Sequence, residues 1–399
     1  MDLESVGDVT GSLTLKSILI GPLLILATVA SGQSADDAAI RKEYTELLEF
    51  LRPPEGVELN EEGARQRAEV FRNNLASFIQ RWIENRGELK TGRLVLGKAL
   101  SMAGRPQEAL PHLKAYFEQH QGHEEYEDGW ITLATTALDA RDLPLAENLL
   151  SRFLAERAGS ERLAVVRYYL GLTRAQMSDP DGAVALLDEV ARGGGDDPLS
   201  ADAALKAIEI LMDWGKADLA RPRLAELLRQ EPEAPYLRAL DEKLTQIGRL
   251  APEWVDMVSW PVGSATTLAA LKGKVVVLTF FADQYEACRD EVTLLGGLAS
   301  SGEFGDTHFQ VLTRYYRPLD RVPASEQDAG LRTLWTELRA TLPLGVASSF
   351  SNLRAYGVRG IPHTVVIGRD GVITHVKIGG SRNNEQAITA LRAAIKRAL

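Results

Sequence analysis

The sequence predicts a multidomain protein in which an all-α helical array is followed by an α/β domain. Over residues 36–250, Ala and Leu recur at steps of three and four residues, which is the spacing of one face of an α-helix. Over residues 251–399, short apolar runs rich in β-branched residues alternate with helical segments, which is typical of a mixed sheet. We therefore expect two folding units after a separate N-terminal segment, residues 1–35.

Length, charge and cysteine content narrow the classes of function. A chain of 399 residues is long enough to bury more than one core. The net charge of −10 argues against a nucleic-acid partner, because a phosphate-binding surface needs clustered Lys and Arg. The single cysteine, Cys288, excludes an intramolecular disulfide, so a dithiol redox cycle would need a second thiol from a partner.

The N-terminal segment carries an apolar run at residues 18–30, preceded by Lys16 and followed by Ser31 and Gly32. This pattern is typical of a signal peptide, and the run is shorter than the length of about 20 residues that a membrane-spanning helix needs. We therefore expect an exported protein of the periplasm or cell envelope. The alternatives are an uncleaved anchor, which would bring contact with a membrane, and a buried helix of the fold.

Four blocks of the helical array repeat with a period of 37 residues. Each block has an Ala followed four residues later by a Leu, and the pairs are Ala109 and Leu113, Ala146 and Leu150, Ala183 and Leu187, and Ala220 and Leu224. A second column, mostly of small residues, lies twelve residues before each Ala, at Gly97, Ala134, Gly171 and Ile208. Such a period indicates stacked helix pairs that touch through the small residues.

This repeat resembles the tetratricopeptide repeat, although its unit is slightly longer than the usual length of about 34 residues. The turns between paired helices, such as 104–106 and 179–182, are rich in Gly, Pro and Asp. The resemblance implies a concave groove that binds extended peptides or helices of other proteins, and a structural platform without a ligand is the alternative. Two upstream helices, 38–51 and 61–85, do not match the repeat and are interpreted as a cap or a degenerate repeat.

The α/β domain is organised around a buried strand that leads directly into a helix. Residues 275–281 form a short apolar run that favours a central strand, and Cys288 follows in the first turns of the next helix. The elements expected after it are a helix from Arg289, a strand over 308–314, a helix around 331–341, an antiparallel hairpin over 365–378 and a closing helix over 385–399. The junction of this strand and helix is where a thiol site would lie.

The order of these elements and three short motifs resemble the TlpA/ResA-like branch of the thioredoxin superfamily. The motifs are Phe280-Phe281-Ala282 at the strand end, Cys288-Arg289 after it, and the later Ile361-Pro362. Family members have Cys-x-x-Cys here, but Tyr285 stands at the first cysteine position. The resemblance implies a thioredoxin-like fold, a cis Ile361-Pro362 peptide bond and a peptide groove at Ile361, Pro362 and His363. For the last of these, a surface histidine without a role is the alternative.

The two thiol positions decide between a catalyst and a binding protein. In the family, the first Cys attacks a disulfide as a thiolate and the second resolves the mixed disulfide. Tyr285 cannot replace the first Cys, because a phenol with a pKa of about 10 is a poor nucleophile towards a disulfide. We therefore expect a non-catalytic module that binds proteins or extended peptides and needs no cofactor. A monothiol oxidoreductase working through Cys288 is the alternative, and a buried Cys288 without a chemical role is a third interpretation.

A peroxidatic site is a further alternative, because Cys288 and Glu291 match the Cys-x-x-Glu of one-cysteine peroxiredoxins. The same motif requires Thr three residues before the Cys and Pro seven residues before it. Those positions hold Tyr285 and Phe281, which argues against this chemistry.

Three histidines lie close together in the helical array, at His112, His120 and His123, among Glu118, Glu124 and Glu125. A group of these residue types is a candidate metal site. Its position at a helix end and in the following loop favours solvated side chains instead, so we expect no metal there.

Overall fold

The computed structural model describes residues 35–50, 61–84, 89–193, 197–382 and 385–399. The apolar run that we interpret as a signal peptide lies outside these residues. Within the described part of the chain, no helix has both the length and the apolar character needed to cross a membrane. The described residues form two compact units, and the division between Ala203 and Ala204 falls inside one helix.

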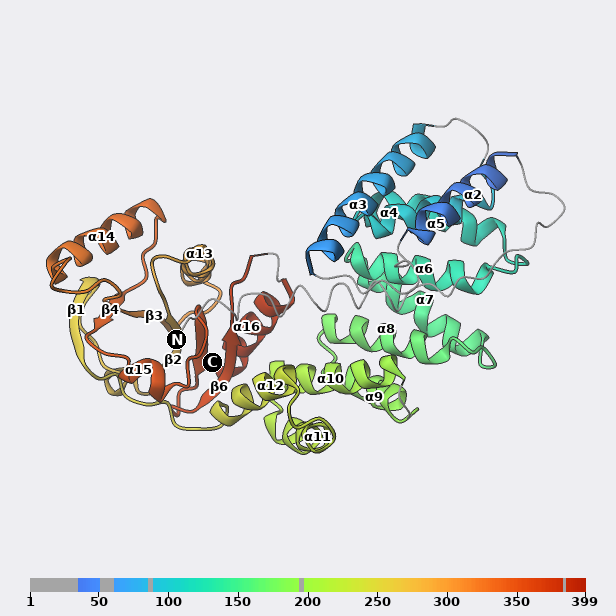
Figure 1. The fold of residues 1–399 in the computed structure, drawn as a ribbon. Coiled ribbons are helices and arrows are strands. Elements are labelled where there is room, and N and C mark those ends of the chain that lie inside the picture. Colours follow the sequence, from blue (N-terminus) through green and yellow to red (C-terminus); the bar gives the residue numbers. More distant parts are fainter. Residues whose placement is uncertain (1–34, 51–60, 85–88, 194–196, 383–384) are drawn as a thin grey trace. The chain divides into compact units, whose positions relative to one another are not determined.

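The first unit is helical throughout, as predicted. Its elements are α2 (Ala35–Glu49), α3 (Glu61–Glu84), α4 (Gly92–Met102), α5 (Pro106–Gln119), α6 (Tyr126–Asp139), α7 (Leu143–Glu156), α8 (Leu163–Gln176) and α9 (Pro180–Ala191). From α4 to α9 each helix packs against the next one along the chain, and α6 also contacts both α4 and α8 (Figure 1). The helices therefore pair in sequence, and one helix of each pair meets its counterpart in the next pair.

Two glycines of the small-residue column fit directly against the second helix of their pair. A Cβ added to Gly97 would lie 2.5 Å from the Leu113 side chain, which is closer than real Cβ contacts. A Cβ added to Gly171 would lie 3.0 Å from Leu187 Cγ and 3.2 Å from the carbonyl oxygen of Ala183. The predicted contact between the two columns is confirmed for these two helix pairs, and the absence of a side chain is what allows the close approach.

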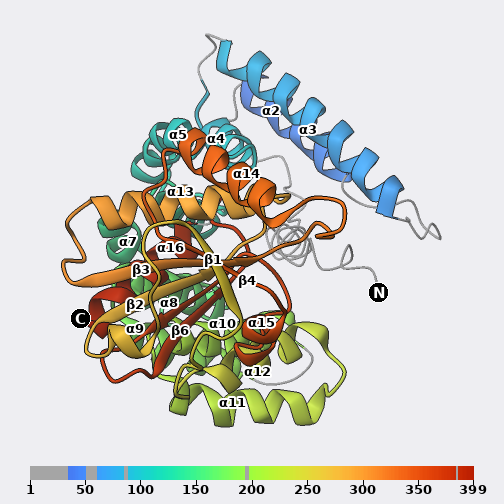
Figure 2. The ribbon, with the colours of Figure 1, turned by 90° about the vertical axis from the view of Figure 1, so that its left-hand side faces the viewer.

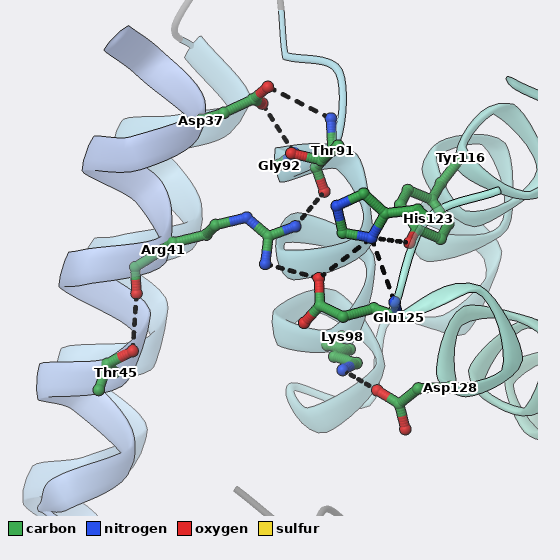
Figure 3. Close-up of polar contacts among 10 residues, drawn as sticks. All are labelled: Asp37, Arg41, Thr45, Thr91, Gly92, Lys98, Tyr116, His123, Glu125 and Asp128. Carbon is green, nitrogen blue, oxygen red and sulfur yellow. Dashed lines mark hydrogen bonds and ion pairs between the residues drawn. The ribbon is translucent and has the colours of Figure 1, made fainter. Parts of the chain in front are cut away.

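A buried polar network joins α2 to the start of α4 and to the residue that precedes α6 (Figure 3). The Asp37 carboxylate accepts hydrogen bonds from the backbone N–H groups of Thr91 and Gly92 at 3.3 and 2.7 Å. Arg41 donates to the Thr91 carbonyl at 3.3 Å and forms an ion pair with Glu125 at 2.6 Å. Helix α2 is thus held to α4 and to the residue before α6 by polar contacts as well as by apolar packing.

The second unit contains a six-stranded mixed sheet with the order β1-β4-β3-β2-β5-β6. Its strands are β1 (Met257–Val262), β2 (Val275–Phe280), β3 (Thr307–Arg314), β4 (Leu344–Ala347), β5 (His363–Ile367) and β6 (Ile373–Ile378). Its helices are α13 (Glu286–Ser300), α14 (Ala324–Glu337), α15 (Ser351–Ala355) and α16 (Glu385–Ala398), with a short 3-10 turn at Ala269–Leu271. Helix α13 packs on β3 and α16 packs on β2, β5 and β6 (Figure 2).

The predicted central strand, the strand after it and the hairpin are confirmed. Strand β2 is buried along its whole length, runs parallel to β3 and is antiparallel to β5. The sequence did not reveal β1, because Pro261 lies within it, but β1 is an edge strand of the sheet and an edge tolerates the missing N–H. Helix α14 begins seven residues before the expected position of residue 331, directly after Pro323.

Three helices carry the chain into the sheet: α10 (Pro198–Asp213), α11 (Ala217–Gln230) and α12 (Pro235–Gln246). Helix α12 packs against β6, and the following segment is fixed by a hydrogen bond of 2.8 Å from Gly248 N to the Ile373 carbonyl. The part of these helices after Ala203 therefore groups with the sheet. The expected limits of 36–250 and 251–399 remain predictions about which segments fold independently.

Candidate functional site

The candidate site lies where β2 ends and α13 begins, as the sequence indicates. Tyr285 is the N-cap residue of α13, and its side chain is 42% exposed. Cys288 lies one turn further along the same helix and is fully buried, with its backbone N–H donating to the Tyr285 carbonyl at 3.1 Å. The two positions of the motif therefore differ: the phenol faces solvent and the thiol lies in the core.

The environment of Cys288 holds its thiol in the neutral form. Burial raises the pKa of Cys288 to about 11, and the nearby carboxylates of Glu291 and Asp283 act in the same direction. A hydrogen bond with the Ala282 backbone and the charge of Lys377 oppose this rise without cancelling it. At neutral pH the side chain is therefore a protonated thiol with little nucleophilic character.

A buried acid lies one turn beyond the thiol, at Glu291. Its Oε2 atom accepts a hydrogen bond from Lys377 Nζ at 2.8 Å and another from the Ser381 hydroxyl, and its Oε1 atom accepts one from Thr364 Oγ1 at 2.9 Å. Thr364 in turn lies 2.9 Å from Thr279 Oγ1 on the central strand. The Glu291 carboxylate is fully buried. Its three partners are side chains from β5, from β6 and from the segment that follows β6.

From the sequence, Glu291 is part of a peroxidatic motif and an acidic neighbour of Cys288, and Lys377 was not identified. The sequence contains a signal for each residue separately, and none for their pairing. Glu291 is three residues after Cys288, which places both side chains on one face of α13. Lys377 lies between Val376 and Ile378 in an expected strand, where an unpaired ammonium group would be costly to bury.

The predicted peptide-groove residues lie at the start of β5. The Ile361-Pro362 peptide bond is cis, as expected. Pro362 is buried, Ile361 is half-buried, and the Pro362 carbonyl accepts a hydrogen bond from Gly379 N at 2.9 Å. This hydrogen bond places the start of β5 next to the segment after β6, which carries the Glu291 partner Ser381.

The alternative interpretation of His363 as a surface histidine is wrong. Its side chain is fully buried, because the residue lies on β5 between Phe280 of β2 and Ile378 of β6. Burial, together with the charges of Lys243 and Lys377, lowers the pKa of His363 to about 4. Within the described residues neither ring nitrogen has a hydrogen-bond partner, so the neutral ring contributes mainly apolar packing.

The histidines of the helical unit make local contacts. His123 Nδ1 lies 3.1 Å from Tyr116 Oη and accepts a hydrogen bond from Glu125 N at 3.2 Å (Figure 3). His120 is close to the same tyrosine ring, with the two ring centroids 5.2 Å apart. The described part of the chain contains no group of three or more His, Cys, Asp or Glu side chains arranged to hold a metal ion.

Comparison with known proteins gives a partial match. No protein-family profile matches the chain. The thiol:disulfide interchange protein CycY of Rhizobium leguminosarum bv. viciae is 28% identical over 134 residues, which are 33% of this chain and 66% of that relative. The matched region thus spans slightly less than two thirds of the length of CycY.

Solved structures match a similar share of the chain. A thioredoxin-family thiol:disulfide interchange protein from Chlorobium tepidum TLS is 18% identical, with a TM-score of 0.30, and the match covers 38% of this chain and 96% of that chain. A thiol-disulfide isomerase from Corynebacterium glutamicum is 19% identical, with a TM-score of 0.31, and the match covers 36% and 96%. The match to CycY shows homology to a thiol:disulfide interchange protein over about a third of the chain.

Proposed function

We propose that the chain is an exported protein-binding module in which tetratricopeptide-like repeats precede a TlpA/ResA-like domain with a degenerate Cys-x-x-Cys motif. The observation that carries this proposal is the chemistry of the two thiol positions. An exposed phenol stands at Tyr285, and a buried thiol with a pKa of about 11 stands at Cys288. Disulfide exchange begins with attack by an accessible thiolate, and neither side chain supplies one.

The proposed partners are proteins, held through two surfaces. In the second unit, the backbone beside Ile361 and Pro362 is the expected place for an extended peptide, since thioredoxin-like domains pair substrate backbone there. In the first unit, α6 contacts both α4 and α8, and these three helices would line the proposed groove of the repeats. Export is proposed from the apolar run at residues 18–30.

A thiol-disulfide oxidoreductase is the second candidate function, and the homology to CycY favours it. Positions 285 and 288 keep the spacing of the two family cysteines at the first turn of α13. On this view the scaffold of the site persists and one sulfur atom is missing. If only the first thiol is missing, Tyr285→Cys should restore disulfide turnover. If the rest of the site is also lost, it should not.

The test is turnover of a protein disulfide with dithiothreitol as the reductant. We expect no turnover above background for the native chain and weak turnover for Tyr285→Cys. The double variant Tyr285→Cys with Cys288→Ser is the matched control, because it keeps the new exposed thiol and removes the resolving one. Appreciable turnover by the native chain that Cys288→Ser abolishes would contradict the binding-protein proposal and make Cys288 a catalytic thiol.

A further inference from the structure

A cleft of about 320 Å³ lies beside the loop that joins β2 to α13. Its walls come from that loop, the first turn of α13, the end of β3 with the segment after it, and α14. The volume is within the range of about 300–1,000 Å³ that is usual for small-molecule sites. Two parallel strands, β2 and β3, end at this edge of the sheet, which is where α/β folds commonly bind ligands.

Three arginines line the cleft, and two of them have no carboxylate partner in the part of the chain that the structure describes. Arg289 donates from Nε and Nη2 to the backbone carbonyl of Asp283 at 3.2 and 2.9 Å. Arg314 donates from the same two atoms to the Tyr315 carbonyl at 3.0 and 2.9 Å. No ion pair among the described residues involves either side chain, so each keeps its full charge and further N–H donors.

The third arginine, Arg317, is paired with the Asp283 carboxylate at 3.0 Å. Three arginines against the two lining carboxylates, Asp283 and Glu337, give the cleft a net charge of +1. The whole chain has a net charge of −10, so this is a local reversal of sign. An anion that enters the cleft would therefore be attracted by this local positive charge.

The positive side chains are held in place before any ligand arrives. The Arg314 guanidinium lies over the Phe350 ring at 3.7 Å and near the Tyr316 ring at 5.0 Å. Buried Gln327 fixes the segment after β3, because its Nε2 donates to the Arg317 carbonyl at 3.0 Å and its Oε1 accepts from Arg317 N at 3.3 Å. Little side-chain freedom of Arg314 remains to be lost on binding, which favours affinity.

We propose that this cleft binds a small ligand through an anionic oxygen group, either a phosphate or a carboxylate. Guanidinium groups match both of these anions with pairs of N–H donors, which gives geometric specificity as well as charge. Tyr316 adds a neutral hydroxyl, since burial raises its pKa further above the physiological range. This function is independent of disulfide chemistry and goes beyond the proposed binding of proteins.

The experiment is isothermal titration calorimetry of the full chain with inorganic phosphate and, separately, with succinate, in a buffer of low ionic strength. We expect saturable binding of at least one anion, and the arm that binds identifies the phosphate or the carboxylate source. Arg289→Gln and Arg314→Gln should each weaken that binding about tenfold, because each removes a charge-assisted contact. Arg321→Gln is the matched control, since it removes the same charge from an exposed residue of the same unit outside the cleft.

The Asp283→Asn variant tests whether a more positive cleft binds the anion more tightly. It removes a negative charge from the cleft and releases the Arg317 guanidinium, so it should tighten binding of the same anion. The proposal is overturned if neither anion binds, if Asp283→Asn leaves affinity unchanged or lower, or if Arg321→Gln weakens binding as much as Arg289→Gln. Arg289 and Arg317 are exposed, so the double variant Arg289→Gln with Arg317→Gln keeps the test decisive if Arg314→Gln does not fold. Native-like affinity in that double variant would also overturn the proposal.

Discussion

Among the described residues, Asp37 of the helical unit and Glu291 of the sheet unit are carboxylates with at most 1% exposure, and they are satisfied in different ways. Asp37 of the helical unit accepts hydrogen bonds from three successive backbone N–H groups, those of Lys90, Thr91 and Gly92, at 3.0, 3.3 and 2.7 Å. Glu291 of the sheet unit is instead surrounded by the side chains of Lys377, Ser381 and Thr364.

The difference shows why burial of an acid does not by itself identify a functional site. Backbone N–H groups at a helix start are present in any sequence that forms the helix, so the role of Asp37 is to stabilise the start of α4. The partners of Glu291 are side chains that come from separate segments and meet beside Cys288, the single thiol. Only the second arrangement places charge where it changes the chemistry of a reactive group.

The largest expected effect comes from removing the ammonium partner of Glu291. Lys377→Met leaves a buried carboxylate without its opposite charge, and breaking such a pair typically costs about 3–5 kcal/mol. The pair is inaccessible to water, since its side chains are 4% and 1% exposed. We expect this loss in the free energy of unfolding, measured by urea titration with tryptophan fluorescence.

The double variant Lys377→Met with Glu291→Gln is the control for that experiment. It removes both charges while keeping similar side-chain volumes, so much of the stability should return. If Lys377→Met alone cost less than about 1 kcal/mol, the ion pair would not be a principal contact of the unit.

Acidification should destabilise the sheet unit more than the helical unit. Burial, with a smaller contribution from nearby positive charges, lowers the pKa of His363 to about 4 and that of His375 to about 3. An unfolded histidine has a pKa of about 6.5, so protons favour the unfolded chain below that pH. Stability is therefore complete above pH 6.5 and is lost as the pH falls towards 4, by roughly 2 kcal/mol for each histidine between pH 6.5 and 5.

Hydrogen exchange read by mass spectrometry measures this loss in each unit separately. Protection in β5 and β6 should fall between pH 7 and 5, after correction for the intrinsic exchange rates. His112 and His120 of the helical unit also have lowered pKa values through burial, but their side chains are only half-buried, so α5 should change less. The double variant His363→Phe with His375→Phe should show little dependence on pH, and an unchanged dependence would assign the loss of stability in acid to other groups.

Removing the Asp37 carboxylate should lower the free energy of unfolding by a smaller amount. Asp37→Ala removes the acceptor for three N–H groups at the start of α4, and loss of such a cap costs about 1–2 kcal/mol. Far-UV circular dichroism during urea unfolding is a suitable measurement, because helices dominate this signal. Asp36→Ala is the matched control on the same turn, and an equal loss in both variants would show that the buried position has no special role.

The sequence predicted the contacts and elements that follow a regular pattern. The 37-residue spacing placed Gly97 against Leu113 and Gly171 against Leu187, since each column recurs at a fixed place on its helix. The apolar run at 275–281 identified the central strand, because a strand buried on both faces has few other possible compositions.

Most features that the sequence did not predict depend on contacts between segments that are distant in the chain. Glu291 and Lys377 are separated by 86 residues, and no local pattern reports their pairing. The burial of His363 follows from its register between β2 and β6, which a single apolar run does not specify. Strand β4 has only four residues, and too few alternations exist in such a strand to distinguish it from a loop.

The last expected effect concerns reactivity more than stability. With a pKa of about 11, the Cys288 thiol should react with iodoacetamide very slowly at pH 7, and the rate should rise about tenfold for each pH unit up to about pH 10. Removing the Glu291 charge should shift this profile to lower pH, because that carboxylate raises the thiol pKa while the Lys377 ammonium, which remains, lowers it.

Glu291→Gln should therefore label faster than the native chain at any given pH, while Asp290→Asn should label at the native rate. Asp290 is the adjacent residue on α13, and its carboxylate pairs with Arg382 and is not among the groups that perturb Cys288. A rate that reached a plateau near pH 7 in the native chain would mean that the thiolate forms readily. That result would contradict the neutral, buried thiol on which the contrast between Asp37 and Glu291 depends, and would favour chemistry at Cys288.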